Sequence, residues 1–137
     1  MSYNTLRYDV ADNILTLTLS RPDHLNAFTV EMAGELIDAF NRASDDAGMD
    51  LSASGNVFGL NESLKPTMDD MENRLEDPEI IAGVRDTGGR VTLAIYDCNK
   101  HVIAAINGAA VGIGATMTCA MDIRLASEHA RIGFVFN

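Results

Sequence analysis

Leucines and threonines alternate near the start of the chain. The segment Ile14–Leu19 has a leucine at every second position and threonines between them, which is the period-two pattern of a strand with one buried face. Asn13, directly before it, suits a hairpin turn. We therefore expect an antiparallel partner strand at Leu6–Val10.

A helical period begins after Thr29. Apolar residues then recur every three to four positions, which predicts a helix from Val30 to about Ser44 with Thr29 as its N-cap. A second helix is expected from about Pro78 to Tyr96. In the first helix the apolar stripe comprises Met32, Leu36, Ile37 and Phe40, and in the second the core-facing residues are Val91, Leu93, Ala94 and Ile95.

A glycine-rich turn carries the main candidate chemistry. Val102–Ile106 predicts a buried strand, Asn107–Gly108 a turn, and Ala115–Met121 a short helix, with Gly112 and Gly114 between them. Backbone N–H groups at such a helix start can bind an oxyanion, a phosphate or a carbonyl oxygen. Glycines also occur there simply to let a helix pack closely on a strand, so the turn alone leaves both interpretations open.

A second candidate motif, Ala47–Leu51, lies earlier in the chain than the glycine-rich turn. Together the two resemble the paired signatures of the crotonase (enoyl-CoA hydratase/isomerase) superfamily, and their order along the chain also fits. The resemblance covers most of the chain except roughly residues 53–90. Further matching segments are Arg21–Phe28, Lys100–Gly108 and Asp122–Glu128.

The resemblance implies an α/β fold of the ClpP/crotonase type, a β/β/α spiral. Residues 1–137 would form one crotonase-like core domain, incomplete because a family member is about twice as long and its C-terminal helical trimerisation region is absent here. The family implies a homotrimer or a dimer of trimers. Between the first helix and Ala47 only Asp45–Asp46 remain, so we expect the central sheet to lack the strand that the family places there.

In the family, two backbone N–H groups form an oxyanion hole for the carbonyl of an acyl-CoA thioester. The matching positions here are Met49 and Ile113, and Ile113 stands where the family commonly has glycine. A β-branched residue resists positive φ. The resemblance also implies contacts with the substrate or its CoA portion at His24, Leu25, Ala27, Asp50, Leu51, Ser52, Gly112, Gly114 and Thr116.

The hydratases of the family use two glutamates, and neither is present. Their positions correspond to Thr116, which has no useful basicity near neutral pH, and to Phe136. Two hypotheses follow. Either the chain belongs to an acyl-CoA enzyme of the hydratase or isomerase type whose proton-transfer group lies elsewhere, or it is a catalytically silent acyl-CoA binder or scaffold. Asp122 is interpreted as a structural residue that accepts backbone hydrogen bonds.

The composition of the chain limits the classes of binding partner that we expect. The net charge of −10 argues against a nucleic-acid surface, and no apolar run is long enough to insert in a membrane. Without a recognisable signal peptide, we expect a cytoplasmic protein. No tightly bound cofactor is expected, only coenzyme A as part of the acyl-CoA substrate. The three histidines share no metal-ligand spacing, and a Rossmann-type dinucleotide domain is disfavoured because Gly112-x-Gly114 lacks the third glycine.

Overall fold

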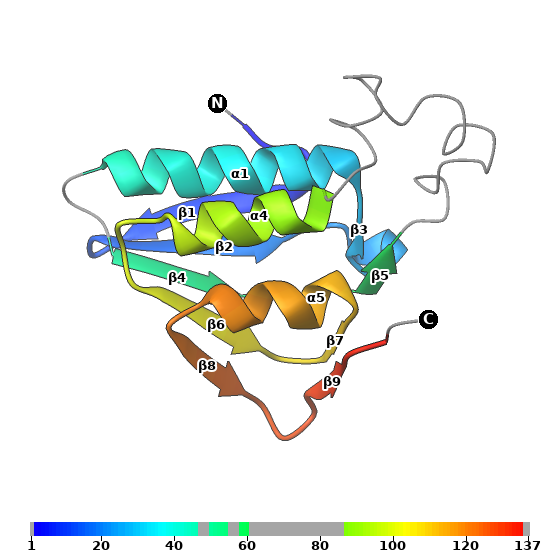
Figure 1. The fold of residues 1–137 in the computed structure, drawn as a ribbon. Coiled ribbons are helices and arrows are strands. Elements are labelled where there is room, and N and C mark those ends of the chain that lie inside the picture. The colour runs from blue at the N-terminus through cyan, green and yellow to red at the C-terminus, as the bar shows by residue number, and fades with distance from the viewer. Residues whose placement is uncertain (1, 47–49, 55–57, 61–86, 136–137) are drawn as a thin grey trace.

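The computed structural model describes residues 2–46, 50–54, 58–60 and 87–135. Its centre is a five-stranded sheet in the order β1-β2-β4-β6-β8 (Figure 1). Strands β2, β4, β6 and β8 are parallel to one another, whereas β1 is antiparallel to β2. Helices α1 and α4 lie side by side over one face of this sheet. In these residues, no helix is long and apolar enough to cross a membrane.

The predicted N-terminal hairpin is confirmed. Strand β1 (Leu6–Ala11) pairs with β2 (Ile14–Leu19), and the connecting residues Asp12 and Asn13 have positive φ values of 52° and 63°. Two successive left-handed residues give a turn whose twist matches that of the flanking strands, and Asp and Asn tolerate this conformation best among residues other than glycine. The leucines of β2 are buried and its threonines half-buried, as the alternation predicts.

Helix α1 (Val30–Asp45) begins where the sequence predicts. The Met32 N–H donates to the Thr29 hydroxyl over 3.1 Å, so Thr29 is the N-cap. Helix α4 (Thr87–Tyr96) confirms the end of the second predicted helix, whereas its expected start near Pro78 lies outside the described residues. Leu93 was wrongly assigned to the core, since it is 58% exposed. It lies two residues from Val91, about 200° around the helix, on the opposite side.

The prediction of a missing central strand is wrong. Strand β4 (Asp50–Ser54) lies between β2 and β6 and pairs with both in parallel. Residues 46–49 connect α1 to β4, which is an ordinary length for a helix-to-strand connection. The prediction failed because it assigned the first residues of β4 to a turn motif. A five-residue segment with serine at alternate positions has a weak strand pattern of its own, and its pairing with β2 and β6 identifies it as a strand.

The chain forms short outer strands after the carboxyl ends of the parallel strands. After β2 come the 3-10 helix η1 (Pro22–His24) and β3 (Ala27–Phe28), and after β4 comes β5 (Phe58–Leu60), which pairs with β3. After β6 (Val102–Ile106) comes β7 (Ala109–Val111), which pairs with β9 (Arg131–Gly133) beyond β8 (Ile123–Ala126). This arrangement gathers the connecting segments at one edge of the sheet.

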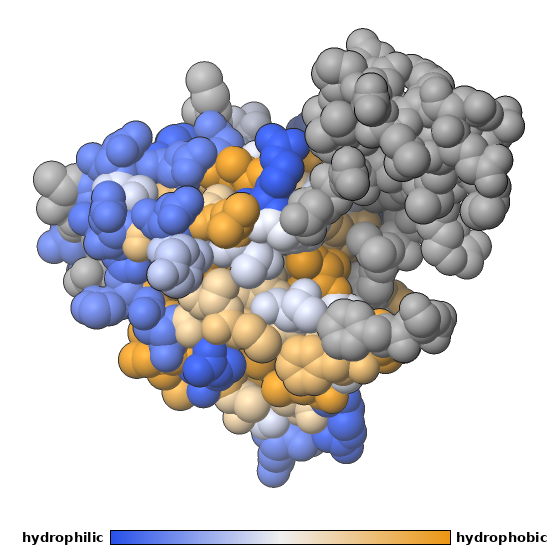
Figure 2. Space-filling model, viewed as in Figure 1, coloured by the Kyte–Doolittle hydropathy of each residue, from blue (hydrophilic) through white to orange (hydrophobic). Residues whose placement is uncertain are grey.

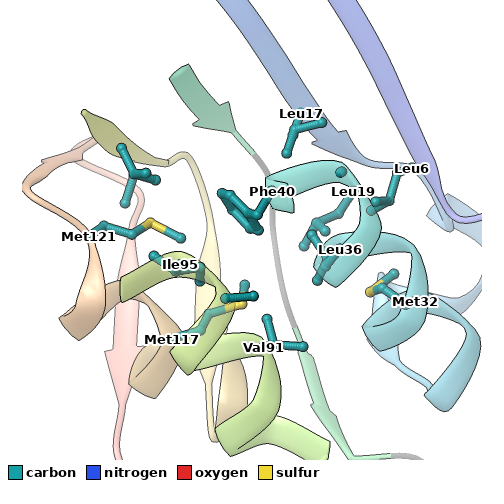
Figure 3. Close-up of a cluster of buried hydrophobic side chains, with 14 of the residues drawn as sticks. Leu6, Leu17, Leu19, Met32, Leu36, Phe40, Val91, Ile95, Met117 and Met121 are labelled. Atoms are coloured by element: carbon teal, nitrogen blue, oxygen red, sulfur yellow. The ribbon is translucent and has the colours of Figure 1, made fainter. Parts of the chain in front are cut away.

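The hydrophobic core fills the space between the sheet and the helices. Figure 3 shows side chains of α1, α4 and the segment after α5 pointing toward those of β2. The methionines Met32, Met117 and Met121 are buried there, so they are core residues as predicted for Met32. Among the largest side chains that are fully buried are Phe28, Phe40, Leu15, Leu17, Met32, Val91 and Val102.

Candidate active site

The segments that follow β2, β4 and β6 meet at the carboxyl edge of the sheet. Strand β5 pairs with β3 on one side and contacts both β7 and α5 (Ile113–Thr116) on the other. Figure 1 shows η1, β3, β5 and the β7–α5 turn gathered at this end of the molecule. Segments far apart in the sequence therefore share one edge, and this edge contains the glycine-rich turn.

Gly112 makes the turn from β7 into α5. Its φ of 59° and ψ of −123° are a combination that residues with a side chain rarely adopt. The Gly112 N–H donates to the carbonyl of Gly133 over 3.1 Å, and the Gly112 carbonyl accepts from the N–H groups of Ala115 and Thr116 over 3.0 Å each. Ile113 has no positive φ. The positive φ that would strain a β-branched residue is therefore found at Gly112 and not at Ile113.

Two backbone N–H groups at this turn have no acceptor among residues 2–46, 50–54, 58–60 and 87–135. The first N–H groups of a helix lack an intrahelical partner. Within the described residues, neither the Ile113 N–H nor the Gly114 N–H donates to any oxygen. Gly114 is buried and Ile113 half-buried, so their amides are partly shielded from water. An oxygen that carries partial negative charge is the group that such donors stabilise.

The helix after the turn starts earlier than the sequence predicts. Helix α5 begins at Ile113, two residues before the predicted start, and continues as the 3-10 helix η3 (Met117–Ala120). The half-buried Thr116 hydroxyl donates to the Ile113 carbonyl over 3.3 Å. Thr116 therefore has a local structural partner and no carboxylate to move protons. Phe136, at the second glutamate position, lies outside the described residues.

Asp122 and Arg124 fasten the far end of this helical segment. The Asp122 carboxylate accepts the Val102 N–H over 2.8 Å, which confirms its predicted structural role. The Arg124 guanidinium donates to the carbonyls of Thr118 and Met121 over 2.9 and 2.7 Å. These contacts tie η3 to the sheet through strands β6 and β8.

The predicted CoA contacts His24, Leu25 and Ala27 lie near the same edge. His24 and Leu25 are exposed, and Leu25 has a φ of 51°. The turn that presents them is closed at its base, where the Arg21 N–H donates to the Asn26 side chain over 2.6 Å and the Arg21 guanidinium donates to the Ala27 carbonyl. Their contact with the CoA portion of a substrate stays a prediction.

The structure places Asp50, Leu51 and Ser52, which the sequence predicts to contact the substrate, away from this edge. Met49 lies outside the described residues. Asp50, Leu51 and Ser52 form the start of β4, where Leu51 is in register with Val102, the first residue of β6. Ile113 follows the opposite, carboxyl end of β6. The segment that reaches the turn is β5, which is not among the predicted strands although Gly55 and Asn56 before it are typical turn residues.

Comparison with known proteins decides the family. The enoyl-CoA hydratase/isomerase family model matches residues 9–137. The chain belongs to the enoyl-CoA hydratase/isomerase family. A Rhodobacter capsulatus protein named "Probable enoyl-CoA hydratase" is 34% identical over 131 residues, which are 95% of this chain and 49% of that protein. Enoyl-CoA hydratase ACTT3 of Alternaria alternata is 34% identical over 140 residues, covering 98% of this chain and 45% of that protein.

Solved structures of the enoyl-CoA hydratase/isomerase family share the fold. An enoyl-CoA hydratase from Mycobacterium avium subsp. paratuberculosis superimposes with a TM-score of 0.75 at 26% identity, and the match covers 96% of this chain and 48% of that one. The predicted crotonase fold is therefore confirmed. The chain spans about half the length of the curated relatives it matches.

Proposed function

We propose that this chain binds an acyl-CoA thioester and stabilises the charge that develops on the thioester oxygen during an enoyl-CoA hydratase or isomerase reaction. The Ile113 N–H is one donor to that oxygen. The second donor comes from the segment that follows the carboxyl end of β4, since β5 is the part of that segment in contact with α5. Met49, the other donor that the sequence predicts, comes before β4 in the sequence, whereas the proposed donor segment comes after it.

The observation that carries the proposal is the Ile113 N–H, which has no acceptor in the part of the chain that the structure describes and lies at an edge where three connecting segments meet. A fixed backbone donor needs no reorganisation when charge moves onto the oxygen, so it stabilises the enolate more than the ground-state thioester. Family membership supplies the substrate class.

The test removes the donor and keeps the turn. Proline is well tolerated as the first residue of a helix, where its missing N–H makes no intrahelical bond. We expect Ile113→Pro to lower the rate of crotonyl-CoA conversion by about 10²- to 10³-fold, as for the loss of one oxyanion donor. The loss of absorbance of the conjugated thioester reports the rate. Ile113→Ala, which keeps the N–H, is the matched control, and equal losses in both variants would contradict the proposal.

The second candidate function is binding without catalysis. Thr116 favours it, because its hydroxyl is engaged with the Ile113 carbonyl and cannot replace a glutamate as a proton carrier. In that case crotonyl-CoA would raise the melting temperature of the chain while its absorbance stayed constant. Stabilisation accompanied by turnover would reject the silent binder in favour of the enzyme.

A further inference from the structure

The side chain of Ile113 packs against the first turn of α4. A Cβ atom placed on Gly88 would lie 2.7 Å from Cδ1 of Ile113 and 3.4 Å from its Cγ1. Carbon atoms that are not bonded pack best at about 3.5 to 4.0 Å. Any side chain at position 88 would therefore displace Ile113, α4 or both.

Helix α4 is the less movable of the two partners. Its residues Val91 and Ile95 are buried in the core, and the helix packs against both α1 and η3. The Thr92 hydroxyl donates to the Gly88 carbonyl over 3.0 Å, so position 88 lies in a regular helical turn. An obstruction at Gly88 would act mainly on Ile113.

Ile113 transmits such a displacement to its own backbone. It is a β-branched residue in a helix, where χ1 has one strongly preferred rotamer, so rotation about χ2 is the adjustment left to the side chain. That rotation is restricted because the side chain also packs on the core cluster. We infer that Gly88 is a positioning residue: the missing side chain lets Ile113 pack against α4 and thereby fixes the direction of the Ile113 N–H. This inference rests on the proposed function.

The first experiment compares Gly88→Ala and Gly88→Val in the full chain with crotonyl-CoA as substrate. We expect Gly88→Ala to lower kcat about tenfold, since a shift of a catalytic group by a fraction of an ångström is costly. KM changes little, because the donor acts chiefly in the transition state. Gly88→Val has the larger effect. Gly34→Ala and Gly34→Val are the matched controls, because Gly34 is an exposed helix position with open space around its Cβ site.

The second experiment tests whether Gly88 acts through Ile113. Ile113→Val removes Cδ1, the atom nearest the added Cβ. We expect Gly88→Ala to lower kcat much less in the Ile113→Val background than in the parent chain. A merely structural role for Gly88 would give the same loss in both backgrounds, and this result would overturn the inference.

The outcomes separate the inference from the proposed function. If the parent converts crotonyl-CoA and Gly88→Ala behaves like Gly34→Ala, the inference is wrong and the proposed function stands. If the parent neither binds nor converts crotonyl-CoA, the proposed function is wrong and the catalytic role of Gly88 falls with it. Thermal unfolding of the parent chain and the three variants of the Gly88–Ile113 cycle then shows whether the two residues are coupled in packing.

Discussion

At the scale of single residues, Gly112 is the position with the strictest conformational requirement. Its combination of positive φ and negative ψ is available to glycine, and a Cβ there would meet no neighbour within 4 Å. The requirement is therefore one of backbone conformation and not of space. We expect Gly112→Ala to lower the free energy of unfolding by about 1 to 3 kcal/mol. Urea denaturation measures the change, with Gly34→Ala as the control.

Thr29 provides a second test at this scale. Its hydroxyl accepts the Met32 N–H at the start of α1. Replacing an N-cap threonine by alanine typically costs about 1 kcal/mol, and we expect Thr29→Ala to destabilise the chain by that amount. Thr29→Ser keeps the acceptor and should retain most of the stability. Equal unfolding midpoints for the alanine and serine variants would show that the cap contributes nothing.

At the scale of elements, the N-terminal segment is fastened to α1 by a polar cluster. The Tyr3 hydroxyl donates to Asp38 over 2.6 Å and accepts from Arg42 over 2.9 Å, and the Arg42 guanidinium lies 4.7 Å from the centre of the Tyr8 ring. The Glu35 carboxylate accepts the N–H groups of Asn4 and Thr5 over 2.7 and 2.9 Å. The segment is thus held along two turns of α1.

This cluster predicts a loss of stability in alkali. Burial raises the pKa of Tyr3 above its ordinary value, and the hydrogen bond to Asp38 adds to the shift. Since the folded state holds the phenolic proton more tightly than the unfolded chain, the contribution of Tyr3 is present below about pH 10 and is lost as the pH rises through the folded-state pKa. The chain should therefore unfold more easily above pH 10, and Tyr3→Phe should reduce that dependence in denaturation measured across pH 8 to 11.

How far the sequence predicts each element depends on its length and neighbours. The bounds of β2 and β6 agree with the predicted strands, because β2 alternates apolar and polar residues and β6 is a short continuous apolar run. Strands of two or three residues such as β3, β5 and β7 are too short to show a period, and β4 is specified by its two partners. The glycine-rich turn of the candidate site was predictable from its motif, whereas its neighbour β5 depends on long-range packing.

At the scale of the whole molecule, the edge strand β8 leaves apolar side chains uncovered. Figure 2, viewed as Figure 1, shows apolar surface in the lower half of the molecule, where α5, β8 and β9 lie. Ile123 and Leu125 are 50% and 59% exposed, and they point to the face of β8 opposite Arg124, whose guanidinium reaches η3. Exposed apolar strands at a sheet edge favour association.

We expect the 137-residue chain to associate through this edge as its concentration rises. The double substitution Ile123→Lys and Leu125→Lys should lower the apparent mass in light scattering and reduce binding of a hydrophobic dye. Its thermal unfolding midpoint should change little, because exposed positions usually contribute less than about 0.5 kcal/mol. An unchanged apparent mass would place the association elsewhere. A variant carrying Leu93→Lys, on the exposed side of α4, controls for added charge.

The hydrogen bond from the Gly112 N–H to the Gly133 carbonyl joins two residues made at different times during synthesis. As the nascent chain leaves the ribosome, β7 and the glycine-rich turn emerge well before their partner strand β9. The turn therefore lacks this support until Gly133 has also emerged. The geometry proposed to bind the thioester oxygen therefore cannot be complete before Gly133 has emerged, whereas the core residues from Leu6 to Met121 emerge earlier.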